Sequence, residues 1–236
     1  MQQTADSNVI SEVAELRKIL AALPALNTPR LMIQVGASEG NFARGFAEKG
    51  WLVHAFDAAP AYETSGPVPS PSGRYHFHNT AIALDERETV TFYVNRRHPT
   101  VSSLKRFHPD HEPVEVPATT LRRFYEQRQI TAIDFFMIDA ELMDLEIMKT
   151  HDWSIPIAAL MMECIPRNVL EIYREISSRC PTYRHLVFEW RKPVAGAGIM
   201  GTCRRIVSAD DHASATSDGT VFGNILFFDR STPRSL

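Results

Sequence analysis

The chain has 236 residues, of which 44% are hydrophobic and 22% are charged, and its formal net charge is −3. This composition is typical of a globular protein and leaves room for one large α/β domain. No apolar run approaches the roughly 20 residues that a membrane span needs, so we expect no membrane partner. The slightly acidic balance disfavours nucleic acid as a partner.

Cysteine usage and the N-terminal sequence bear on the compartment. Cys164, Cys180 and Cys203 are odd in number and widely spaced, which argues against a disulfide framework and for a reducing compartment. The N-terminus lacks a basic segment followed by an apolar core, so no secretory signal is evident. We therefore expect a cytoplasmic protein.

Residues 8–23 predict an amphipathic helix, because apolar side chains recur there at helical spacing. Asp6 or Ser7 is a suitable N-cap for it. We expect residues 1–30 to form an N-terminal helical extension that covers the sheet of a single domain spanning 31–236.

The stretch 31–40 predicts a buried strand, a tight turn and the start of a helix over 40–49. Gly36 lets the backbone turn with positive φ and lets a ligand approach closely. The amides that open the helix after Gly40 would face that ligand. A strand that runs through a glycine turn into a helix is typical of nucleotide-binding, doubly wound α/β folds.

A second buried strand is expected over 51–56, and Asp57 follows it. An acidic residue about 20 residues beyond the glycine turn binds ribose hydroxyls in such folds, so we predict that role for Asp57. The alternative is that Asp57 only caps the turn before Pro60. The ribose role is favoured because both halves of the pattern are present.

After a polar loop over 59–73, residues 75–84 predict a third strand and its exit. Asn79 and Thr80 lie near its end, where a polar group can reach the edge of an adenine. Residues 85–94 predict a turn and an extra strand that is rich in β-branched and aromatic residues.

Residues 95–113 form a polar insertion with several histidines. His108 and His111 raise the question of a metal site, but zinc needs a third ligand and the intervening proline breaks helical spacing. A solvated loop is the expected structure, and no metal is predicted. A histidine of this loop acting as a catalytic base is the better functional alternative.

Residues 133–138 predict a buried strand whose end carries Asp139 and Glu141. Carboxylates at strand ends of an open α/β sheet point into the crevice where ligands bind. Capping of the helix expected over 143–150 is the alternative, and it accounts for the pair only in part. A short strand over 114–116 and a helix from Thr119 or Thr120 to Arg128 precede this segment.

The last part of the chain predicts three more strands and one helix, over 157–162, 183–190, 221–228 and 168–179. The long stretch 191–218 contains Gly196-Ala-Gly198-Ile-Met-Gly201. We discount this glycine motif as a dinucleotide site, because too little chain follows for a βαβ unit and the next residues are not an apolar helix face. A loop or lid is expected instead.

The order and spacing of these segments resemble class I S-adenosylmethionine-dependent methyltransferases, and more narrowly the FkbM-type family. That family typically carries D-x-G-A-x-x-G at the turn, A-F-E-P after the second strand and I-D-x-x-K-x-D-x-E-G at the fourth. The matching stretches here are Gln34-Val-Gly-Ala-Ser-Glu-Gly40, Ala55-Phe-Asp-Ala58 and Ile133 to Leu142. The resemblance covers about residues 31–229 and implies an α/β fold with a single Rossmann-like, doubly wound sheet of seven strands, preceded by the N-terminal helix.

Three positions depart from the family pattern. Gln34 replaces the first acidic residue, Met137 replaces the lysine and Leu142 replaces the last glycine. Asp57 is one methylene shorter than the family's glutamate. Gln34 can form hydrogen bonds but cannot balance the positive charge of the cofactor, so a weakened or lost activity is an open alternative.

The resemblance implies S-adenosylmethionine as the cofactor, bound by Gly36, Ala37, Ser38, Gly40, Asp57, Asn79, Thr80 and Asp139. It also implies methyl transfer to a hydroxyl of a small molecule, such as a sugar or a natural product, with Asp139 and Glu141 as candidate general bases. The alternatives are an inactive binding or interaction module and, less favoured because no separate catalytic domain follows, a nicotinamide-dependent oxidoreductase. A homodimer is left open.

Overall fold

The computed structural model describes residues 11–62, 73–191, 205–215 and 221–229. The chain divides into two compact units. One unit comprises residues 25–158, and the other comprises residues 1–24 together with 159–236. The glycine turn and the polar strand ends that the sequence singles out all belong to the unit 25–158.

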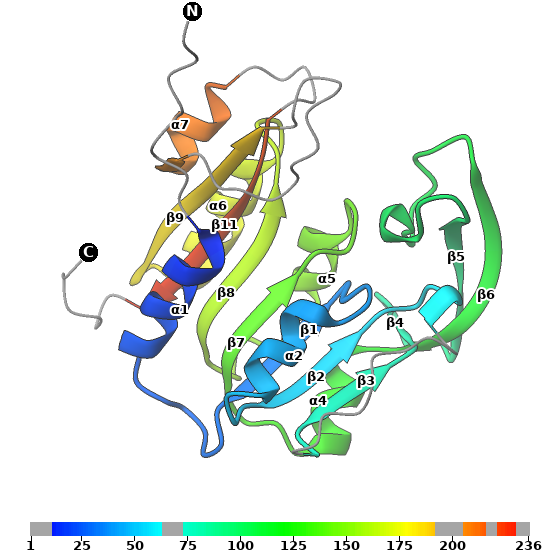
Figure 1. Ribbon diagram of the computed structural model, residues 1–236, viewed down its shortest axis with the longest axis horizontal. Coiled ribbons are helices and arrows are strands. Elements are labelled where there is room, and N and C mark those ends of the chain that lie inside the picture. The colour runs from blue at the N-terminus through cyan, green and yellow to red at the C-terminus, as the bar shows by residue number, and fades with distance from the viewer. Residues whose placement is uncertain (1–10, 63–72, 192–204, 216–220, 230–236) are drawn as a thin grey trace, which may run out of the picture. The chain divides into compact units, whose positions relative to one another are not determined.

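The unit 25–158 is built on a parallel sheet in the order β7-β1-β2-β3 (Figure 1). These strands are β1 (Leu31–Val35), β2 (Leu52–Phe56), β3 (Tyr75–His78) and β7 (Ile133–Ile138). Every residue of β1 and β7 is buried, which is why both strands are nearly continuous apolar runs.

Helices cover both faces of this sheet. Phe46 on α2 packs on Phe135 with 5.6 Å between ring centroids, whereas Phe124 on α4 packs on Phe56 at 4.9 Å. The register of β1 with β2 and β7 puts Phe56 and Phe135 on opposite faces. Helices α2 (Asn41–Ala47), α4 (Leu121–Arg128) and α5 (Asp144–Lys149) belong to this unit.

The strand predicted over 75–84 is wrong in one respect, because the chain leaves the parallel sheet at the end of β3. Ala81–Ile82 forms β4 instead, in a second sheet with the order β4-β6-β5. At the break, the Asn79 side-chain amide donates to the carbonyl oxygens of Asp57 and Ala59, at 2.9 and 3.1 Å. These bonds fix the turn after β2 and separate the two short strands.

The second sheet corrects the solvated loop expected over 95–113. β5 spans Thr89–Asn95, and β6 spans His111–Thr119 rather than only 114–116. All of β5 pairs antiparallel with residues 111–117 of β6, and a short 3₁₀ helix, η1 (Pro99–Val101), lies between the two strands in the chain. Prolines and glutamates inside β6 weaken its strand signal in the sequence. Side chains of β5 and β6 pack with residues after β2 into a small core of their own.

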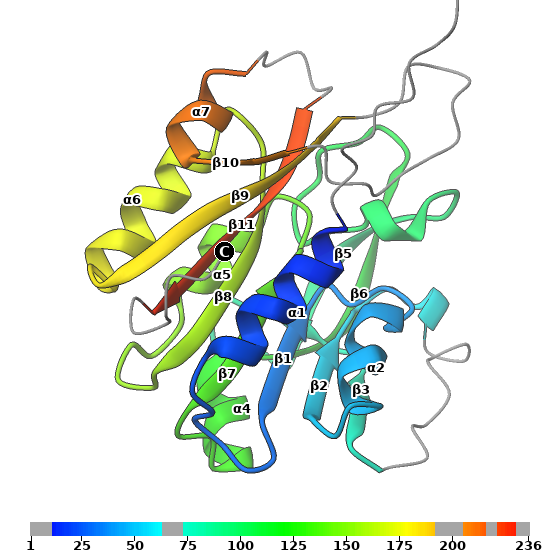
Figure 2. The ribbon, with the colours of Figure 1, turned by 60° about the vertical axis from the view of Figure 1, so that its left-hand side comes forward.

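The other unit contains an antiparallel sheet in the order β10-β9-β11-β8. Its strands are β8 (Ile157–Cys164), β9 (Tyr183–Arg191), β10 (Arg205–Val207) and β11 (Val221–Asp229). Helices α6 (Val169–Arg179) and α7 (Ala209–Ala213) belong to the same unit, and α7 lies against both α6 and β9 (Figure 2).

The uninterrupted loop predicted over 191–218 is wrong, because β10 and α7 both form within it. Both elements are short, and two of the three residues of β10 are exposed, so neither carries a clear apolar period. Ser208 caps α7, with its side chain accepting from the Asp211 amide at 3.1 Å. The glycine motif at 196–201 lies outside the described residues.

The N-terminal helix α1 spans Glu12–Ala22, and Ser11 is its N-cap, with its hydroxyl oxygen accepting from the Ala14 amide at 3.3 Å. The cap expected at residues 6 or 7 is therefore wrong, and those residues lie outside the described part of the chain. The Asn224 side-chain amide donates to Glu12 Oε1 at 2.7 Å and ties α1 to β11.

The fold expected from the sequence is confirmed as an α/β architecture with a parallel core and an N-terminal helix. No helix in the described ranges is long and apolar enough to cross a membrane. The parallel core brings the carboxyl ends of β1, β2 and β7 to one edge, which is where open α/β sheets bind their ligands.

Candidate functional site

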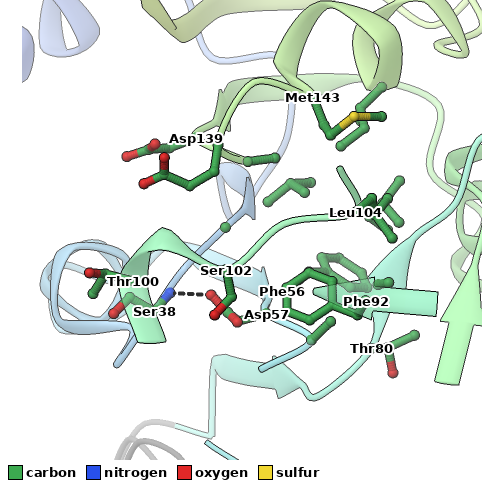
Figure 3. A pocket seen from close by; sticks show the side chains of 18 of the residues that line it. Ser38, Phe56, Asp57, Thr80, Phe92, Thr100, Ser102, Leu104, Asp139 and Met143 are labelled. Atoms are coloured by element: carbon green, nitrogen blue, oxygen red, sulfur yellow. Dashed lines mark hydrogen bonds between the residues drawn. The ribbon is translucent and has the colours of Figure 1, made fainter. Parts of the chain in front are cut away.

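A cavity of about 210 Å³ lies at the carboxyl ends of β1, β2 and β7 (Figure 3). Gly36 follows β1, Asp57 follows β2 and Asp139 follows β7, and all three line the cavity. The structure therefore brings together the three strand ends that the sequence predicts to form the site.

The turn after β1 leaves no room for a side chain at Gly36. Its φ is +77°, and a Cβ atom placed there would lie 1.7 Å from the carbonyl oxygen of Asp139. The amides of Gly36 and Ala37 both donate to the carbonyl oxygen of Phe56, each at 2.9 Å. Glycine is thus required by the neighbouring backbone as well as by φ, and the turn joins the ends of all three strands.

Asp57 caps the glycine turn and also lines the cavity. Its Oδ2 accepts a hydrogen bond from the Ser38 amide at 2.7 Å, drawn in Figure 3, and its Oδ1 accepts from the Ala59 amide at 2.9 Å. Burial raises the pKa of Asp57, and the two amide hydrogen bonds oppose that rise. Each carboxylate oxygen has a further lone pair, so the capping role and a ribose contact are compatible.

Asp139 is the second carboxylate on the cavity wall. Burial, together with the charge of Asp57, raises the pKa of Asp139 to about 6. At the start of α5, burial and the charge of Asp139 raise the pKa of Asp144 to about 8. Burial and mutual repulsion therefore hold the pKa values of two neighbouring acids above their usual range. Sequence reasoning missed Asp144, whose only signal was a third acid shortly after Asp139 and Glu141.

The connection from β7 to α5 has an unusual backbone. Glu141 and Leu142 have φ values of +49° and +72°, which residues other than glycine rarely adopt. The Ala140 amide donates to Asp144 Oδ1 at 3.2 Å, and Ser103 Oγ donates to the carbonyl oxygen of Glu141 at 2.8 Å. Strain of this kind gathers at binding and catalytic sites, and here Glu141 itself lines the cavity.

One end of the cavity is apolar and was not predicted from the sequence. Phe56 and Phe92 lie side by side there, with Leu104 and Met143 nearby (Figure 3). Leu104 comes from the insertion between β5 and β6, as do the lining residues Pro99, Thr100 and Ser102. Leu104, one of few apolar residues in this mostly polar insertion, was the signal that could have placed the segment at the site.

The other residues predicted for cofactor binding fall into two groups. Ser38 and Thr80 line the cavity. Ala37 is buried in the turn, Gly40 adopts a φ of +71° as the N-cap of α2, and the Asn79 amide is bound by two carbonyl oxygens. None of these last three is on the cavity wall formed by the described residues.

No histidine of the insertion is on that wall, as far as the structure describes it. His111 is buried, its Nε2 lies 2.9 Å from the carbonyl oxygen of Val101, and its Nδ1 accepts from the Phe107 amide at 3.4 Å. His108 packs beside it, with 5.8 Å between ring centroids. His111 therefore holds η1 in place. Across the described ranges no three potential metal ligands gather at one point.

Two of the residues that depart from the family pattern are neighbours. Gln34 on β1 and Met137 on β7 are register partners, and their exposed fractions are 4% and 7%. Gln34 Oε1 has no hydrogen-bond partner among the described residues. Neither residue belongs to the described cavity wall, so the two replacements change the sheet rather than the surface that a ligand meets.

A parallel α/β core with a glycine turn after β1 and acids after β2 and β7 is typical of nucleotide-binding α/β folds. The chain belongs to the family described as the methyltransferase FkbM domain, whose model matches residues 34–189. The matched range contains every residue that the sequence predicts for the site.

Three solved structures illustrate the similarity. The chain matches the 23S rRNA methyltransferase ErmE with 10% identity and a TM-score of 0.48, covering 97% of this chain and 72% of that one. It matches TrmK of M. capricolum, solved with S-adenosyl-homocysteine, with 10% identity and a TM-score of 0.41, covering 94% of this chain and 70% of that one. For a TehB-like SAM-dependent methyltransferase from Corynebacterium glutamicum the identity is 12%, the TM-score is 0.42 and the coverage is 95% and 90%. No curated protein is similar enough to count as a match.

Proposed function

We propose that this methyltransferase transfers the methyl group of S-adenosylmethionine to a hydroxyl oxygen of a small molecule. The observation that carries the proposal is the convergence of Gly36, Asp57 and Asp139 on one cavity. A glycine turn suits the amino-acid end of the cofactor, an acid after the second strand suits its ribose, and an acid after β7 suits its positively charged end.

The residues around the cavity support a definite orientation of the cofactor. The turn containing Gly36 and Ser38 holds the amino-acid end, and Asp57 accepts hydrogen bonds from the ribose hydroxyls. Thr80 is on the cavity wall, and we assign it to the adenine end. Ala37, Gly40 and Asn79 serve this arrangement indirectly, by holding the turns that present the lining residues.

Methyl transfer is an in-line displacement at a carbon that the sulfonium already activates. Alignment of the two reactants can contribute roughly 7–11 kcal/mol to such a reaction. The carbon–sulfur bond breaks as the carbon–oxygen bond forms, and the hydroxyl proton must leave. Asp139, with its pKa near 6, is suited to accept that proton at neutral pH, and Glu141 is the second candidate base.

The rival proposal, an inactive binding module, rests on the departures at positions 34, 137 and 142. Because Gln34 and Met137 are register partners, the loss of an acid and a lysine together leaves no unpaired buried charge, so these two departures do not weaken the sheet on which the site is built. Leu142 retains the positive φ that a glycine would adopt at its position. The three departures therefore leave no unpaired charge in the sheet and do not change the backbone conformation at position 142.

Calorimetry with S-adenosylhomocysteine tests the proposal. Asp57→Ala should weaken binding, because each charge-assisted hydrogen bond that it removes is worth roughly 1.5–3 kcal/mol. Asp57→Asn, which keeps the size of the side chain, distinguishes lost binding from lost folding. Glu126→Ala, at an exposed acid on α4, is the matched control. Unchanged affinity in both Asp57 variants would remove this residue from the site.

Two further measurements separate the rival functions. No binding of S-adenosylhomocysteine at millimolar concentration would favour the inactive module, and binding of NAD in its place would favour an oxidoreductase. Transfer of a labelled methyl group to a panel of small hydroxyl compounds, matched with amine and thiol analogues, tests the choice of oxygen as acceptor.

A further inference from the structure

The segment 95–109 forms part of the cavity wall and is basic. Two acids, Asp110 and Glu112, follow it directly and line a hollow together with Arg97. The segment contains four basic residues, Arg96, Arg97, Lys105 and Arg106, and no aspartate or glutamate, in a chain whose net charge is −3. The residues of this segment that line the cavity, Pro99, Thr100, Ser102 and Leu104, lie between the two basic pairs in the sequence. The basic residues therefore flank the stretch that reaches the site.

Buried polar side chains fix the backbone turn at the first basic pair. Asn95 is 1% exposed, and its Oδ1 accepts from the amides of Arg97 and His98, at 3.1 and 3.0 Å. The backbone amide of Asn95 in turn donates to Ser102 Oγ at 3.1 Å. The turn that presents Arg97 is thus organised before any ligand binds, which lowers the entropy cost of using it for recognition.

A buried serine fixes the backbone at the start of the second basic pair in the same way. Ser103 is 1% exposed, and its Oγ accepts from the Lys105 amide at 3.1 Å while it donates to the carbonyl oxygen of Glu141 at 2.8 Å. His111 holds the carbonyl oxygen of Val101 at 2.9 Å. One serine therefore connects the start of the second pair directly to a residue of the cavity wall.

Three of the four basic side chains are available to a ligand. Arg96 forms an ion pair with Glu112, at 2.5 Å. Arg97, Lys105 and Arg106 are exposed, and within the described ranges none of them forms a salt bridge.

The charges inside the cavity have the opposite sign. The charged residues on its described wall are Asp57, Asp139 and Glu141, which suit a sulfonium but repel an anion. An anionic acceptor could therefore place only its neutral hydroxyl inside, and its charge would have to remain outside, near the basic segment.

We propose that the methyl acceptor is a small molecule with a phosphate-type anionic group, which Arg97, Lys105 and Arg106 hold while its hydroxyl enters the cavity. This inference rests on the proposed function. The guanidinium fork matches phosphate oxygens in geometry and charge. Three cations are few compared with the roughly 6–10 phosphate contacts typical of nucleic-acid binding, so a small molecule fits better than a polymer.

The test uses the full chain saturated with S-adenosylhomocysteine and inorganic pyrophosphate as the probe, with binding followed by calorimetry. We expect the wild type to bind pyrophosphate, and the variant Arg97→Gln/Lys105→Gln/Arg106→Gln to bind it at least about tenfold more weakly. Arg174→Gln, at an exposed arginine on α6, should bind like the wild type. Because all three substituted side chains are exposed, the melting temperature of the triple variant should not change.

The affinity for S-adenosylhomocysteine separates this inference from the function on which it rests. If the triple variant keeps that affinity and loses pyrophosphate, the inference holds. Equal pyrophosphate binding in the wild type and the triple variant, or an equal loss in Arg174→Gln, would mean an adventitious ion only and would overturn it. A single-stranded oligonucleotide and a phosphatidylglycerol vesicle are tested in the same way. If either binds the wild type far more tightly than pyrophosphate does, and the triple variant loses that binding, the proposal that the acceptor is a small molecule is overturned. If S-adenosylhomocysteine does not bind the wild type, it is the proposed function that fails.

Discussion

Gln34 on β1 and Met137 on β7 are register neighbours in the parallel sheet, and both are buried. The resembling family has an acid and a lysine at these two positions. In this chain both positions are neutral, and replacing an acid and a lysine together leaves no unpaired buried charge.

The first prediction follows from this pair. Gln34→Asp places an unpaired carboxylate in the sheet and should lower the free energy of unfolding by about 3–5 kcal/mol. Adding Met137→Lys should recover part of the loss, because the new charges are neighbours. Urea denaturation of the two single variants, the double variant and the wild type measures the coupling. Strictly additive effects would contradict the pairing.

Gly36 gives a second prediction, because the Cβ atom of an alanine there would overlap the carbonyl oxygen of Asp139. Gly36→Ala should destabilise the protein by about 3 kcal/mol or more and abolish binding of S-adenosylhomocysteine. The matched control is Gly73→Ala: its φ is +65°, and a Cβ atom there meets nothing within 4 Å. That control should cost only about 1 kcal/mol, so similar losses in both variants would rule out the overlap as the cause.

Leu142 gives a third prediction. Its φ is +72° and 44% of its surface is exposed, so its side chain contributes little packing while its backbone is strained. Leu142→Gly should raise the free energy of unfolding by about 1 kcal/mol, which thermal denaturation can measure. Leu142→Ala removes the side chain but keeps the strain, and it should not give this gain. A gain in both variants would point to the exposed side chain instead.

The cofactor-binding role that we propose for Asp139 predicts that cofactor binding depends on pH. With a pKa of about 6, Asp139 is ionised above that pH and takes up a proton below it, so the cavity loses one negative charge as the pH falls. The affinity for the sulfonium cofactor should then drop by up to about tenfold per pH unit, whereas that for S-adenosylhomocysteine, which lacks the sulfonium charge, should change much less. Calorimetry with both ligands from about pH 5 to pH 8 measures the difference. Asp139→Asn should abolish the difference in pH dependence between the two ligands. If the difference persists in this variant, another group causes it.

A pair of buried histidines predicts acid sensitivity of the fold. Nδ1 of His54 and Nε2 of His78 lie 3.0 Å apart, and burial lowers their pKa values from 6.5 to about 3 and about 4. As the pH falls, the two histidines are therefore protonated in the unfolded chain before they are protonated in the folded one. The stability present above pH 6.5 is thus lost as the pH falls toward 4.

His78→Gln tests this sensitivity, because glutamine keeps a hydrogen-bonding partner for His54 without the titrating ring. The free energy of unfolding of the wild type should fall relative to the variant, by up to about 1.4 kcal/mol per pH unit between pH 6.5 and 4. The carboxyls with raised pKa values act in the opposite sense, but they are present in both proteins and cancel in the difference. Parallel pH profiles would remove the histidine pair as the cause.

The sequence predicted the parts of the molecule where one physical cause dominates. β1 and β7 are apolar because both faces of each strand are buried, and the acids Asp57 and Asp139 are found by their position directly after such strands. Both inferences need only local pattern and the rule that parallel strand ends meet at one edge of the sheet.

What the sequence did not predict depends on contacts between distant residues. β6 contains Pro113 and Pro117 and is held by its pairing with β5, which no local pattern shows. The apolar end of the cavity combines residues far apart in the chain, such as Phe92 and Met143. The role of Asp144 appears only when its burial beside Asp139 is known.

Every residue recorded on the cavity wall belongs to the unit 25–158, and none comes from the described part of the remaining chain. The described wall of the cavity is therefore encoded by one uninterrupted stretch of polypeptide, and substitutions in the described C-terminal strands and helices replace none of its residues.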